Sequence, residues 1–215
     1  MKYYGYFRSS AAYRLRIAFG LKGLSPDFIA IHLTRDGGQQ KTEAYRAVNP
    51  QALLPSLVTD EGDVLTQSPA ILEWLDETFP APPLLPADPI GRARVRAFAN
   101  VICCDIHPLQ NLRVLQYLRK EYGQDQGGVE AWCRTWLGEG LAACEALVAR
   151  GGEHRFCFGE TPGLADICLV PQLFSADRFG VDLGAMPRLR AVRAECEALP
   201  AFAAAHPSRQ PDTEA

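Results

Sequence analysis

The fold is decided by a stretch near the N-terminus, KYYGYFRSSAAYRLRIAFGLKGLSPDFIAIHL (residues 2–33). Residues 2–7 are rich in aromatic side chains and predict a β-strand, and residues 27–33 predict a second strand. Between them, residues 11–23 have apolar side chains at helical spacing and end in a glycine, so they predict a helix. A strand, a helix and a strand in this order form a βαβ unit, because parallel strands need a crossover connection.

The following segment completes a small sheet. Residues 53–67 (LLPSLVTDEGDVLTQ) contain two short apolar runs around an Asp-Glu-Gly turn, which predicts a hairpin. Residues 68–79 (SPAILEWLDETF) predict a helix with Ser68 as its N-cap and Pro69 at the first helical position. The element order is β-α-β-β-β-α, apart from a short helix in the polar loop before the hairpin. We expect a four-stranded mixed sheet with helices packed on it, which is the order of a thioredoxin-like domain.

The rest of the chain predicts helices alone. A proline-rich stretch, APPLLPADP, is typical of a linker, and no convincing strand follows it. The apolar spacing predicts a helix over 91–123 that is broken or kinked at Pro108, and further helices over 128–152, 164–180 and 186–206. The predicted organisation is an α/β thioredoxin-like domain over 1–80, a linker over 81–89 and an all-α domain over 90–215.

Composition excludes several classes of function. The net charge of −3 comes from acidic and basic residues that are interspersed, so the chain has no basic stripe for nucleic acid. No run of about 18 apolar residues occurs and the first residues lack the apolar core of a signal peptide, so we expect a cytoplasmic protein without membrane contact. The seven cysteines form no CxxC pair and have no histidine at zinc-finger spacing, so we expect reduced, mostly buried thiols and no metal site.

Three positions have a side chain or a backbone suited to chemistry. Ser9 and Ser10 precede the first helix, where a hydroxyl donor and the helix dipole would stabilise a thiolate, although capping of the helix explains them equally well. Leu54 precedes a proline, and a cis bond there would leave its backbone able to pair with an extended peptide. Gln67 and Ser68 open a helix whose N-terminus suits a small carboxylate, but a plain N-cap also explains Ser68.

Eight segments, taken together and in order, are far more specific than any one of them. They are FRSSAAYRLRIA (7–18), DGGQQ (36–40), NPQALLPSL (49–57), LTQSPAILEWL (65–75), DIHPLQNLRVL (105–115), LADICLVPQ (164–172), ADRFGVDL (176–183) and HPSRQPDT (206–213). This set resembles the zeta class of glutathione transferases, the maleylacetoacetate and maleylpyruvate isomerases, over nearly the whole chain. The resemblance implies the glutathione transferase fold, a thioredoxin-like domain followed by an all-α domain.

The resemblance also implies which residues bind glutathione and a small anionic substrate. It implies that Ser9 and Ser10 bind and activate the glutathione sulfur, and it leaves open which of the two does so. It implies that Arg178 binds substrate. Arg8, which immediately precedes the serines, and Arg113 are further candidates because a guanidinium matches a carboxylate, although an exposed charge is the alternative for Arg8 and Arg178. The other implied glutathione-binding residues are Arg14, Gln40, Leu54, Gln67, Ser68, His107, Asn111, Leu112 and Arg113, and His107 is also explained as part of a helix-breaking His-Pro pair.

The chain departs from the family pattern at two positions. Ala11 stands where the family's Ser-Ser-Cys motif has its cysteine, so we expect no protein thiol beside the glutathione sulfur. Gly163 replaces the family's capping Ser or Thr three residues before Asp166, so half of a reciprocal cap is missing, at an expected cost of a few tenths of a kcal/mol. From the residues alone, Arg14 and Arg16 are expected to be surface or interdomain charges.

The implied function is glutathione-dependent cis–trans isomerisation of a maleyl keto acid, either maleylacetoacetate or maleylpyruvate, in aromatic catabolism. A thiolate that adds to the cis double bond makes it single, allows rotation and leaves again, so glutathione is not consumed. Two alternatives stay open: a glutathione transferase that conjugates or dehalogenates small electrophiles such as α-haloacids, and a non-catalytic thiol-binding module. The resemblance also implies a homodimer.

Overall fold

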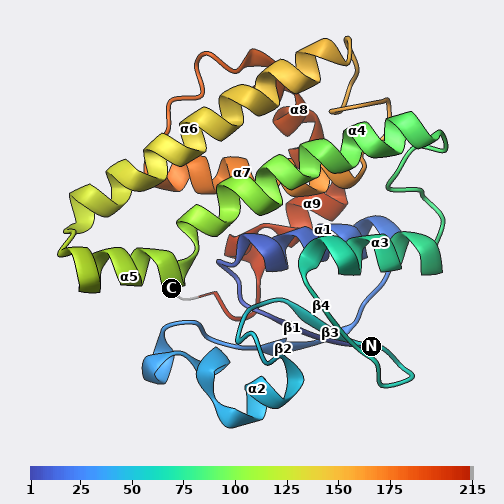
Figure 1. Cartoon of the computed structure of the whole chain (residues 1–215). Helices are drawn as coiled ribbons and strands as arrows, with labels where there is room; N and C mark the ends of the chain where they lie inside the picture. The colour runs from blue at the N-terminus through green and yellow to red at the C-terminus, as the bar shows by residue number, and fades with distance from the viewer. Residues whose placement is uncertain (214–215) are drawn as a thin grey trace. The chain divides into compact units, whose positions relative to one another are not determined.

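The computed structural model describes residues 1–213 and divides into two compact units (Figure 1). The first unit comprises Met1–Pro83 and Ala198–Ala215, and the second comprises Leu84–Glu197. The first unit therefore takes a segment from the far end of the chain, which the sequence analysis had grouped with the helical domain. Its elements are β1 (Lys2–Gly5), α1 (Ser10–Lys22), β2 (Asp27–Ala30), α2 (Glu43–Val48), β3 (Ser56–Val58), β4 (Val64–Thr66), α3 (Ser68–Thr78) and α9 (Pro200–Ala205).

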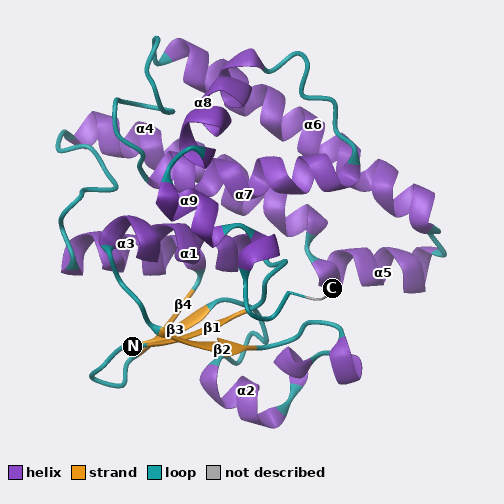
Figure 2. Ribbon diagram, turned by 180° about the vertical axis from the view of Figure 1, so that it is seen from behind, coloured by secondary structure: helices purple, strands orange, loops and turns teal. Residues whose placement is uncertain are grey.

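The strands of the first unit form one mixed sheet in the order β2-β1-β3-β4 (Figure 2). β1 is parallel to β2, with Tyr3 opposite Phe28, and antiparallel to β3. β3 and β4 form the predicted hairpin, in which Leu57 lies opposite Leu65. Helices α1 and α3 lie on one side of the sheet and α2 lies on the other (Figures 1 and 2). The predicted thioredoxin-like arrangement is confirmed.

Helix α1 is covered on all sides, and residues 11–19 are all buried. Tyr3 of β1 packs its ring against Phe19, with the ring centroids 5.2 Å apart. On another side α1 contacts α9, where a Cβ on Gly20 would lie 3.0 Å from the Cβ of Ala201. The glycine therefore permits the close approach of α9 to the C-terminal half of α1.

The second unit is helical in the part of the chain that the structure describes. The predicted break near Pro108 is confirmed: after α4 the chain forms a π-helical turn over Val101–Ile106 and a 3₁₀ turn over His107–Gln110. Asn111 is extended and starts the next helix. Helix α7 packs against α4, α6 and α8 in this unit. The helices are α4 (Pro89–Asn100), α5 (Leu112–Tyr122), α6 (Gln126–Arg150), α7 (Leu164–Phe179) and α8 (Pro187–Glu197).

The prediction of one helix over 186–206 is wrong. Helix α8 ends at Glu197, and α9 begins at Pro200. Proline fits only the first turn of a helix and disfavours the helical conformation in the residue before it, and Leu199 is accordingly extended, with φ −83° and ψ 135°. Apolar spacing continued across this break and concealed it.

The start of α7 shows why residue 163 is a glycine. Asp166 accepts hydrogen bonds from the backbone N–H groups of Gly163 and Cys157, both at 2.9 Å, and burial raises its pKa although these two donors lower it. A Cβ on Gly163 would lie 2.7 Å from the carbonyl oxygen of Leu84. The expected penalty for lacking a Ser or Thr cap does not apply, because this backbone has no room for either.

Five of the seven cysteines are buried, as the sequence predicted. Cys103 is half-buried and Cys104 is exposed. Within residues 1–213, no helix has both the length and the hydropathy to cross a bilayer. The same described residues contain no group of three or more side chains suited to hold a metal ion.

Candidate active site

The turn between β1 and α1 presents the two predicted serines. Ser9 is the N-cap of α1, and its Oγ accepts a hydrogen bond from the backbone N–H of Ala12 at 3.2 Å. A hydroxyl that accepts a bond in this way keeps its own proton to donate, so capping and stabilisation of a thiolate are compatible in one residue. Ser10 is the first residue of the helix. Arg8 is exposed, with its guanidinium 5.0 Å from the ring centroid of Phe7.

A buried arginine joins α1 to α3. Arg14 is only 1% exposed and donates from Nη1 to the Oγ of Ser68 at 3.1 Å. The expectation that Arg14 and Arg16 are surface charges is therefore wrong, since Arg16 is buried as well. Ser68 is not the N-cap of α3 but its first residue, and Gln67 occupies the cap position. Two of the implied glutathione-binding residues, Arg14 and Ser68, are thus in direct contact.

The N-terminus of α3 has no side-chain cap. Its cap residue, Gln67, has φ 66° and ψ 110°, a backbone conformation that costs a residue with a side chain about 1–3 kcal/mol. The side chain of Gln67 donates from Nε2 to Oε1 of Gln51 at 2.8 Å. Such strain is typical of ligand-binding positions, and an uncapped helix start suits a carboxylate.

The loop before β3 has a fixed conformation around Leu54. The bond from Leu54 to Pro55 is cis, as the sequence analysis expected. The carbonyl oxygen of Leu53 accepts hydrogen bonds from Oη of Tyr45 at 2.7 Å and from Nδ2 of Asn49 at 2.9 Å. These bonds hold the loop immediately before Leu54, so its backbone is presented in one conformation.

Gln40 is buried, and its side chain contacts the segment that follows β2. Its Nε2 donates to the carbonyl oxygen of Leu33 at 3.2 Å, whereas no donor among the described residues reaches its Oε1. A buried acceptor without a partner is a position where a ligand N–H would bind. Gly38 has φ 103°, and a Cβ there would lie 2.8 Å from both amide atoms of Gln40. The glycine in DGGQQ therefore makes room for this amide.

Four implied residues lie together at the break before α5 in the second unit. His107 begins the 3₁₀ turn, and Asn111 is the N-cap of α5, with its Oδ1 accepting from the backbone N–H of Arg113 at 3.2 Å. Leu112 is the first residue of α5, and Arg113 is exposed. The cap uses only the amide oxygen of Asn111, so its side-chain N–H groups can donate to a ligand.

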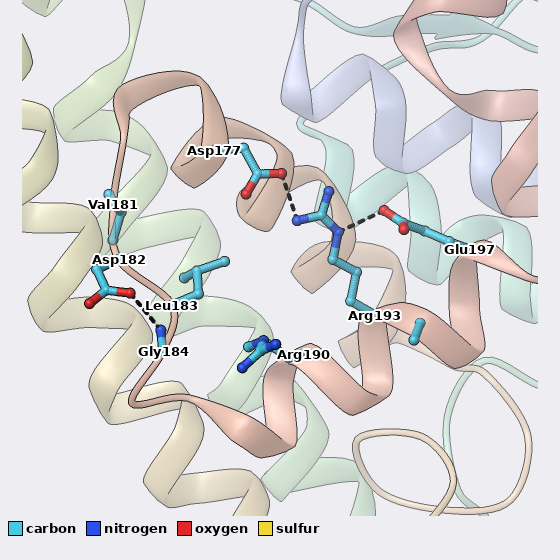
Figure 3. Close-up of a pocket in the computed structure, with 9 residues that line it drawn as sticks. Asp177, Val181, Asp182, Leu183, Gly184, Arg190, Arg193 and Glu197 are labelled. Carbon is cyan, nitrogen blue, oxygen red and sulfur yellow. Dashed lines mark hydrogen bonds and ion pairs between the residues drawn. The ribbon is translucent and has the colours of Figure 1, made fainter.

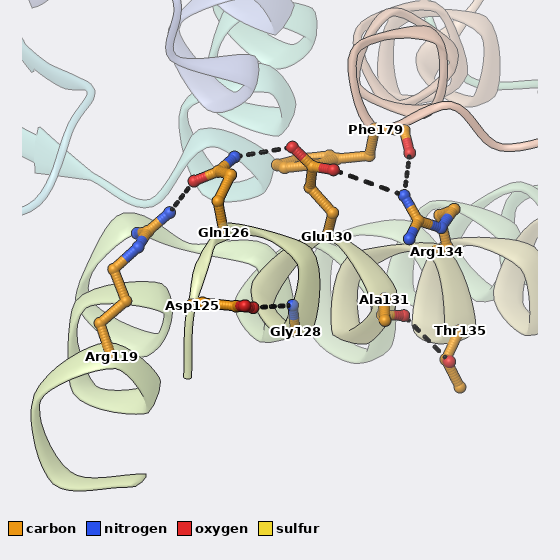
Figure 4. Close-up of polar contacts among 9 residues, drawn as sticks. All are labelled: Arg119, Asp125, Gln126, Gly128, Glu130, Ala131, Arg134, Thr135 and Phe179. Atoms are coloured by element: carbon orange, nitrogen blue, oxygen red, sulfur yellow. Dashed lines mark hydrogen bonds and ion pairs between the residues drawn. The ribbon is translucent and has the colours of Figure 1, made fainter. Parts of the chain in front are cut away.

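The last turn of α7 carries Arg178, which is exposed with its guanidinium 4.9 Å from the ring centroid of Phe179. Arg134 of α6 donates to the carbonyl oxygen of Phe179 at 3.4 Å and pairs with Glu130 at 3.7 Å (Figure 4). This network ties the end of α7 to α6. Burial raises the pKa of Cys133 to about 11, and the neighbouring Arg178 guanidinium lowers it. Arg178 therefore stands on a helix end whose backbone is tied to α6 in the second unit.

A polar pocket of about 560 Å³ lies beside α7 and α8 in the second unit (Figure 3). Arg193 pairs with Asp177 at 2.6 Å and with Glu197 at 2.7 Å. None of the residues implied by the resemblance lines this pocket. Its central arginine is already bound by two carboxylates, so we assign it no ligand.

The sequence analysis missed the residues that hold the β1–α1 turn. The backbone N–H of Phe7 donates to Oδ2 of Asp212, and its carbonyl oxygen accepts from Nη2 of Arg16. The terminal RQPDT belongs to one of the segments that carry the family resemblance, but the resemblance implies no role for it. No local pattern connects residue 212 with residue 7.

The first unit combines a thioredoxin-like sheet, a serine at the start of α1, a cis-proline loop and an uncapped start of α3, and the chain continues into a helical unit. These features define a glutathione S-transferase. The family model of the glutathione S-transferase N-terminal domain matches residues 8–78, and that of the C-terminal domain matches residues 128–204.

Comparison with individual relatives shows which class of the family the chain belongs to. A maleylacetoacetate isomerase from Pseudomonas aeruginosa is 52% identical over 215 residues, which is 100% of both chains. A holo structure of maleyl pyruvate isomerase, a bacterial zeta-class glutathione S-transferase, is 50% identical with a TM-score of 0.96, again over 100% of both chains. Maleylacetoacetate isomerase from Methylobacterium extorquens AM1, with bound malonate and GSH, is 40% identical with a TM-score of 0.95 over 100% of both chains. The chain belongs to the zeta class of the glutathione S-transferase family.

Proposed function

We propose that this protein is a glutathione-dependent cis–trans isomerase of a maleyl keto acid, maleylacetoacetate or maleylpyruvate, in aromatic catabolism. The observation that carries this proposal is the β1–α1 turn, in which the exposed guanidinium of Arg8 immediately precedes the hydroxyl of Ser9. A thiolate needs a hydrogen-bond donor and a substrate carboxylate needs a cation. Isomerisation of an anionic maleyl group by a thiol needs both.

The residues of the first unit fit glutathione. The buried Oε1 of Gln40 would accept an N–H of the tripeptide, and the backbone of Leu54 would pair with its cysteinyl unit. The uncapped start of α3, at Gln67 and Ser68, would hold the γ-glutamyl carboxylate, and Arg14 would orient Ser68. When bound, glutathione supplies a thiolate that adds to the cis double bond, permits rotation and leaves unconsumed.

The serines are the proposed activators of the glutathione sulfur. Ser9 has a hydroxyl proton to donate while its oxygen caps α1, and Ser10 stands in the first helical turn. Ala11 is buried and carries no thiol, so the reactive sulfur comes from glutathione alone. A mixed disulfide or covalent capture at residue 11 is thereby excluded.

Three arginines are the proposed substrate-binding residues. Arg8, Arg113 and Arg178 are all exposed, and each has a planar guanidinium that matches a carboxylate through two hydrogen bonds. They would hold the substrate carboxylates and stabilise the negative charge that develops on the substrate carbonyl oxygen. The proposed glutathione contacts from the second unit are His107, Asn111, Leu112 and Arg113.

The proposal is tested by a spectrophotometric assay of maleylacetoacetate and maleylpyruvate with and without glutathione. We expect turnover of one or both only when glutathione is present. A turnover rate that does not depend on glutathione would refute the mechanism. Faster conversion of an α-haloacid or another small electrophile would favour the second candidate, a conjugating or dehalogenating transferase, which the thiolate-binding Ser9 would serve equally well.

The proposed organisation has a glutathione-binding domain over residues 1–80, a linker over 81–89 and a helical substrate-binding domain over 90–215. A homodimer is proposed from the family resemblance, and a cytoplasmic location is proposed from the sequence composition. Light scattering on the purified protein tests the dimer, since a monomer mass would contradict it. Cell fractionation tests the location.

A further inference from the structure

The terminal RQPDT segment, residues 209–213, has no role in the proposed function, yet it has a well-defined hydrogen-bonded conformation. The Oγ1 of Thr213 donates to the carbonyl oxygen of Pro207 at 2.6 Å. The backbone N–H of Thr213 donates to the carbonyl oxygen of Gln210 at 3.1 Å. The Nε2 of Gln210 donates to the carbonyl oxygen of His206 at 2.9 Å. The segment is therefore a closed loop rather than a loose end of chain.

This loop and α1 together hold the two backbone polar groups of Phe7 in the active-site turn. Oδ2 of Asp212 accepts from the backbone N–H of Phe7 at 2.9 Å. The carbonyl oxygen of Phe7 accepts from Nη2 of Arg16 at 3.1 Å, and Nε of the same arginine donates to the carbonyl oxygen of Ala205 at 3.0 Å. Two side chains that are nearly 200 residues apart thus fix the two sides of Phe7, immediately before Arg8.

The two side chains carry opposite charges, and Arg16 is buried whereas Asp212 is half-buried. Arg16 is 9% exposed, and its guanidinium is directed at backbone carbonyls. Burial raises the pKa of Tyr3 to about 12, while Arg16 lowers it and Asp212 raises it, so both charges lie close to the same ring. A charge-assisted hydrogen bond is roughly twice as strong as a neutral one, so each of these side chains holds its backbone partner firmly.

The turn depends on these anchors because the sheet ends before it. Strand β1 stops at Gly5, and within the turn the backbone N–H of Ser9 donates to the carbonyl oxygen of Tyr6 at 3.0 Å. Rotation of the Tyr6–Phe7 peptide, whose N–H is bound by Asp212, would change the direction in which the chain leaves the sheet. A displacement of about 1 Å at a reacting group can lower a rate about 100-fold.

We propose that Asp212 is a positioning residue of the active site, which acts by holding the backbone N–H of Phe7 and thereby orienting Arg8 and Ser9. This inference rests on the proposed function, because those two residues are the proposed substrate and thiolate contacts. Asp212 itself is not among the proposed substrate and thiolate contacts. Its removal should therefore change the chemistry of the site rather than remove a ligand contact.

The test uses three variants of the full chain. Asp212→Ala removes the acceptor of the Phe7 N–H, whereas Asp212→Asn keeps an amide oxygen that can accept it. Thr213→Val is the matched control, because it removes the bond to Pro207 in the same loop and leaves the bond to Phe7. For each variant we would measure the thermal midpoint, the pKa of bound glutathione from thiolate absorbance, and kcat for a maleyl substrate. Hydrogen exchange of the Phe7 amide would be measured by NMR on the ligand-free protein.

We expect Asp212→Ala to exchange the Phe7 amide about tenfold faster, to raise the bound thiol pKa by about one unit and to lower kcat about tenfold, the factor of one ordinary hydrogen bond. Asp212→Asn should recover most of each effect. Thr213→Val should change only the thermal midpoint.

Three results would overturn the assignment. They are a folded Asp212→Ala variant with unchanged thiol pKa and kcat, an Asp212→Asn variant as impaired as Asp212→Ala, and a Thr213→Val variant that shifts the thiol pKa equally. If the unmodified protein binds glutathione but isomerises no maleyl substrate, the proposed function fails alone. The exchange rate and the thiol pKa then still decide the role of Asp212.

Discussion

Replacing Ser9 with alanine removes two interactions of one hydroxyl, and each has its own measurable result. The Oγ of Ser9 caps α1 by accepting from the Ala12 N–H at 3.2 Å. Loss of such a cap costs about 1 kcal/mol, which lowers the melting temperature of a chain of this size by about 2–4 °C. The hydroxyl proton is the proposed donor to the bound thiolate, and a hydrogen bond to a charged group contributes about 1.5–3 kcal/mol.

The second loss should lower kcat/KM for a maleyl substrate by about 10- to 100-fold. It should also raise the pKa of the bound glutathione thiol by about 1–2 units, because the thiolate form loses its donor. Calorimetry measures the first effect, and titration of the thiolate absorbance with steady-state kinetics measures the second. Ser10→Ala in the same assays identifies which serine activates the thiol.

Asp125→Ala is the matched control for Ser9→Ala. The Oδ1 of Asp125 caps α6 by accepting from the Gly128 N–H at 2.8 Å (Figure 4), in the second unit and away from the proposed serines in the chain. It should lower the melting temperature similarly and leave the thiol pKa unchanged. The reasoning is refuted if Ser9→Ala is less stable but keeps the thiol pKa and kcat/KM of the unmodified protein, since Ser9 would then be a cap alone.

The remaining predictions concern a substrate residue, a backbone position and pH. Arg178→Ala should impair turnover of a maleyl substrate far more than conjugation of a neutral electrophile, and equal losses in parallel assays would count against the isomerase. Gly163→Ser should lower the melting temperature, because its Cβ would lie 2.7 Å from the carbonyl oxygen of Leu84, and a rise in calorimetry would contradict this. Stability should fall above about pH 9, because burial raises the pKa of Cys133 to about 11 and of Cys144 to about 12, whereas unfolded thiols ionise near about 8.5. Because the folded pKa values are raised, the contribution of each thiol to the free energy of unfolding is complete below the unfolded pKa and is lost as pH rises, by up to about 1.4 kcal/mol per thiol and pH unit. Cys144→Ala should make the melting temperature depend less steeply on pH in this range. A melting temperature of the unmodified protein that stays constant as pH rises would contradict the prediction.

Local pattern predicted the elements of the first unit because their causes are local. Alternating and helical apolar spacing, the glycine that ends α1 and the turn of the hairpin all act within a few residues. The same reasoning placed the break near Pro108, where proline removes a backbone donor. It failed at Ser68, because the choice between N-cap and first helical residue depends on the backbone conformation of Gln67.

The burial of charged side chains was predicted least well from the sequence. Arg14 and Arg16 were expected to be surface or interdomain charges, yet both are buried and bind partners within the first unit. The reason is that α1 is covered on more than one side, and one of its neighbours, α9, comes from residues 200–205. A helix with partners on several sides has no solvent face to which its arginines can be assigned from spacing.

The sequence by itself determined the order of strands and helices, the family, and the residue types from which a thiol-dependent site can be made. How those residues are held follows from the tertiary structure: Ser9 caps α1, Arg14 binds Ser68, and Asp212 and Arg16 hold the backbone N–H and carbonyl oxygen of Phe7. The physical reason is the separation along the chain over which each kind of interaction acts. Backbone propensities act between near neighbours, whereas a buried polar group must find its hydrogen-bond partner wherever folding brings one, at any distance along the chain.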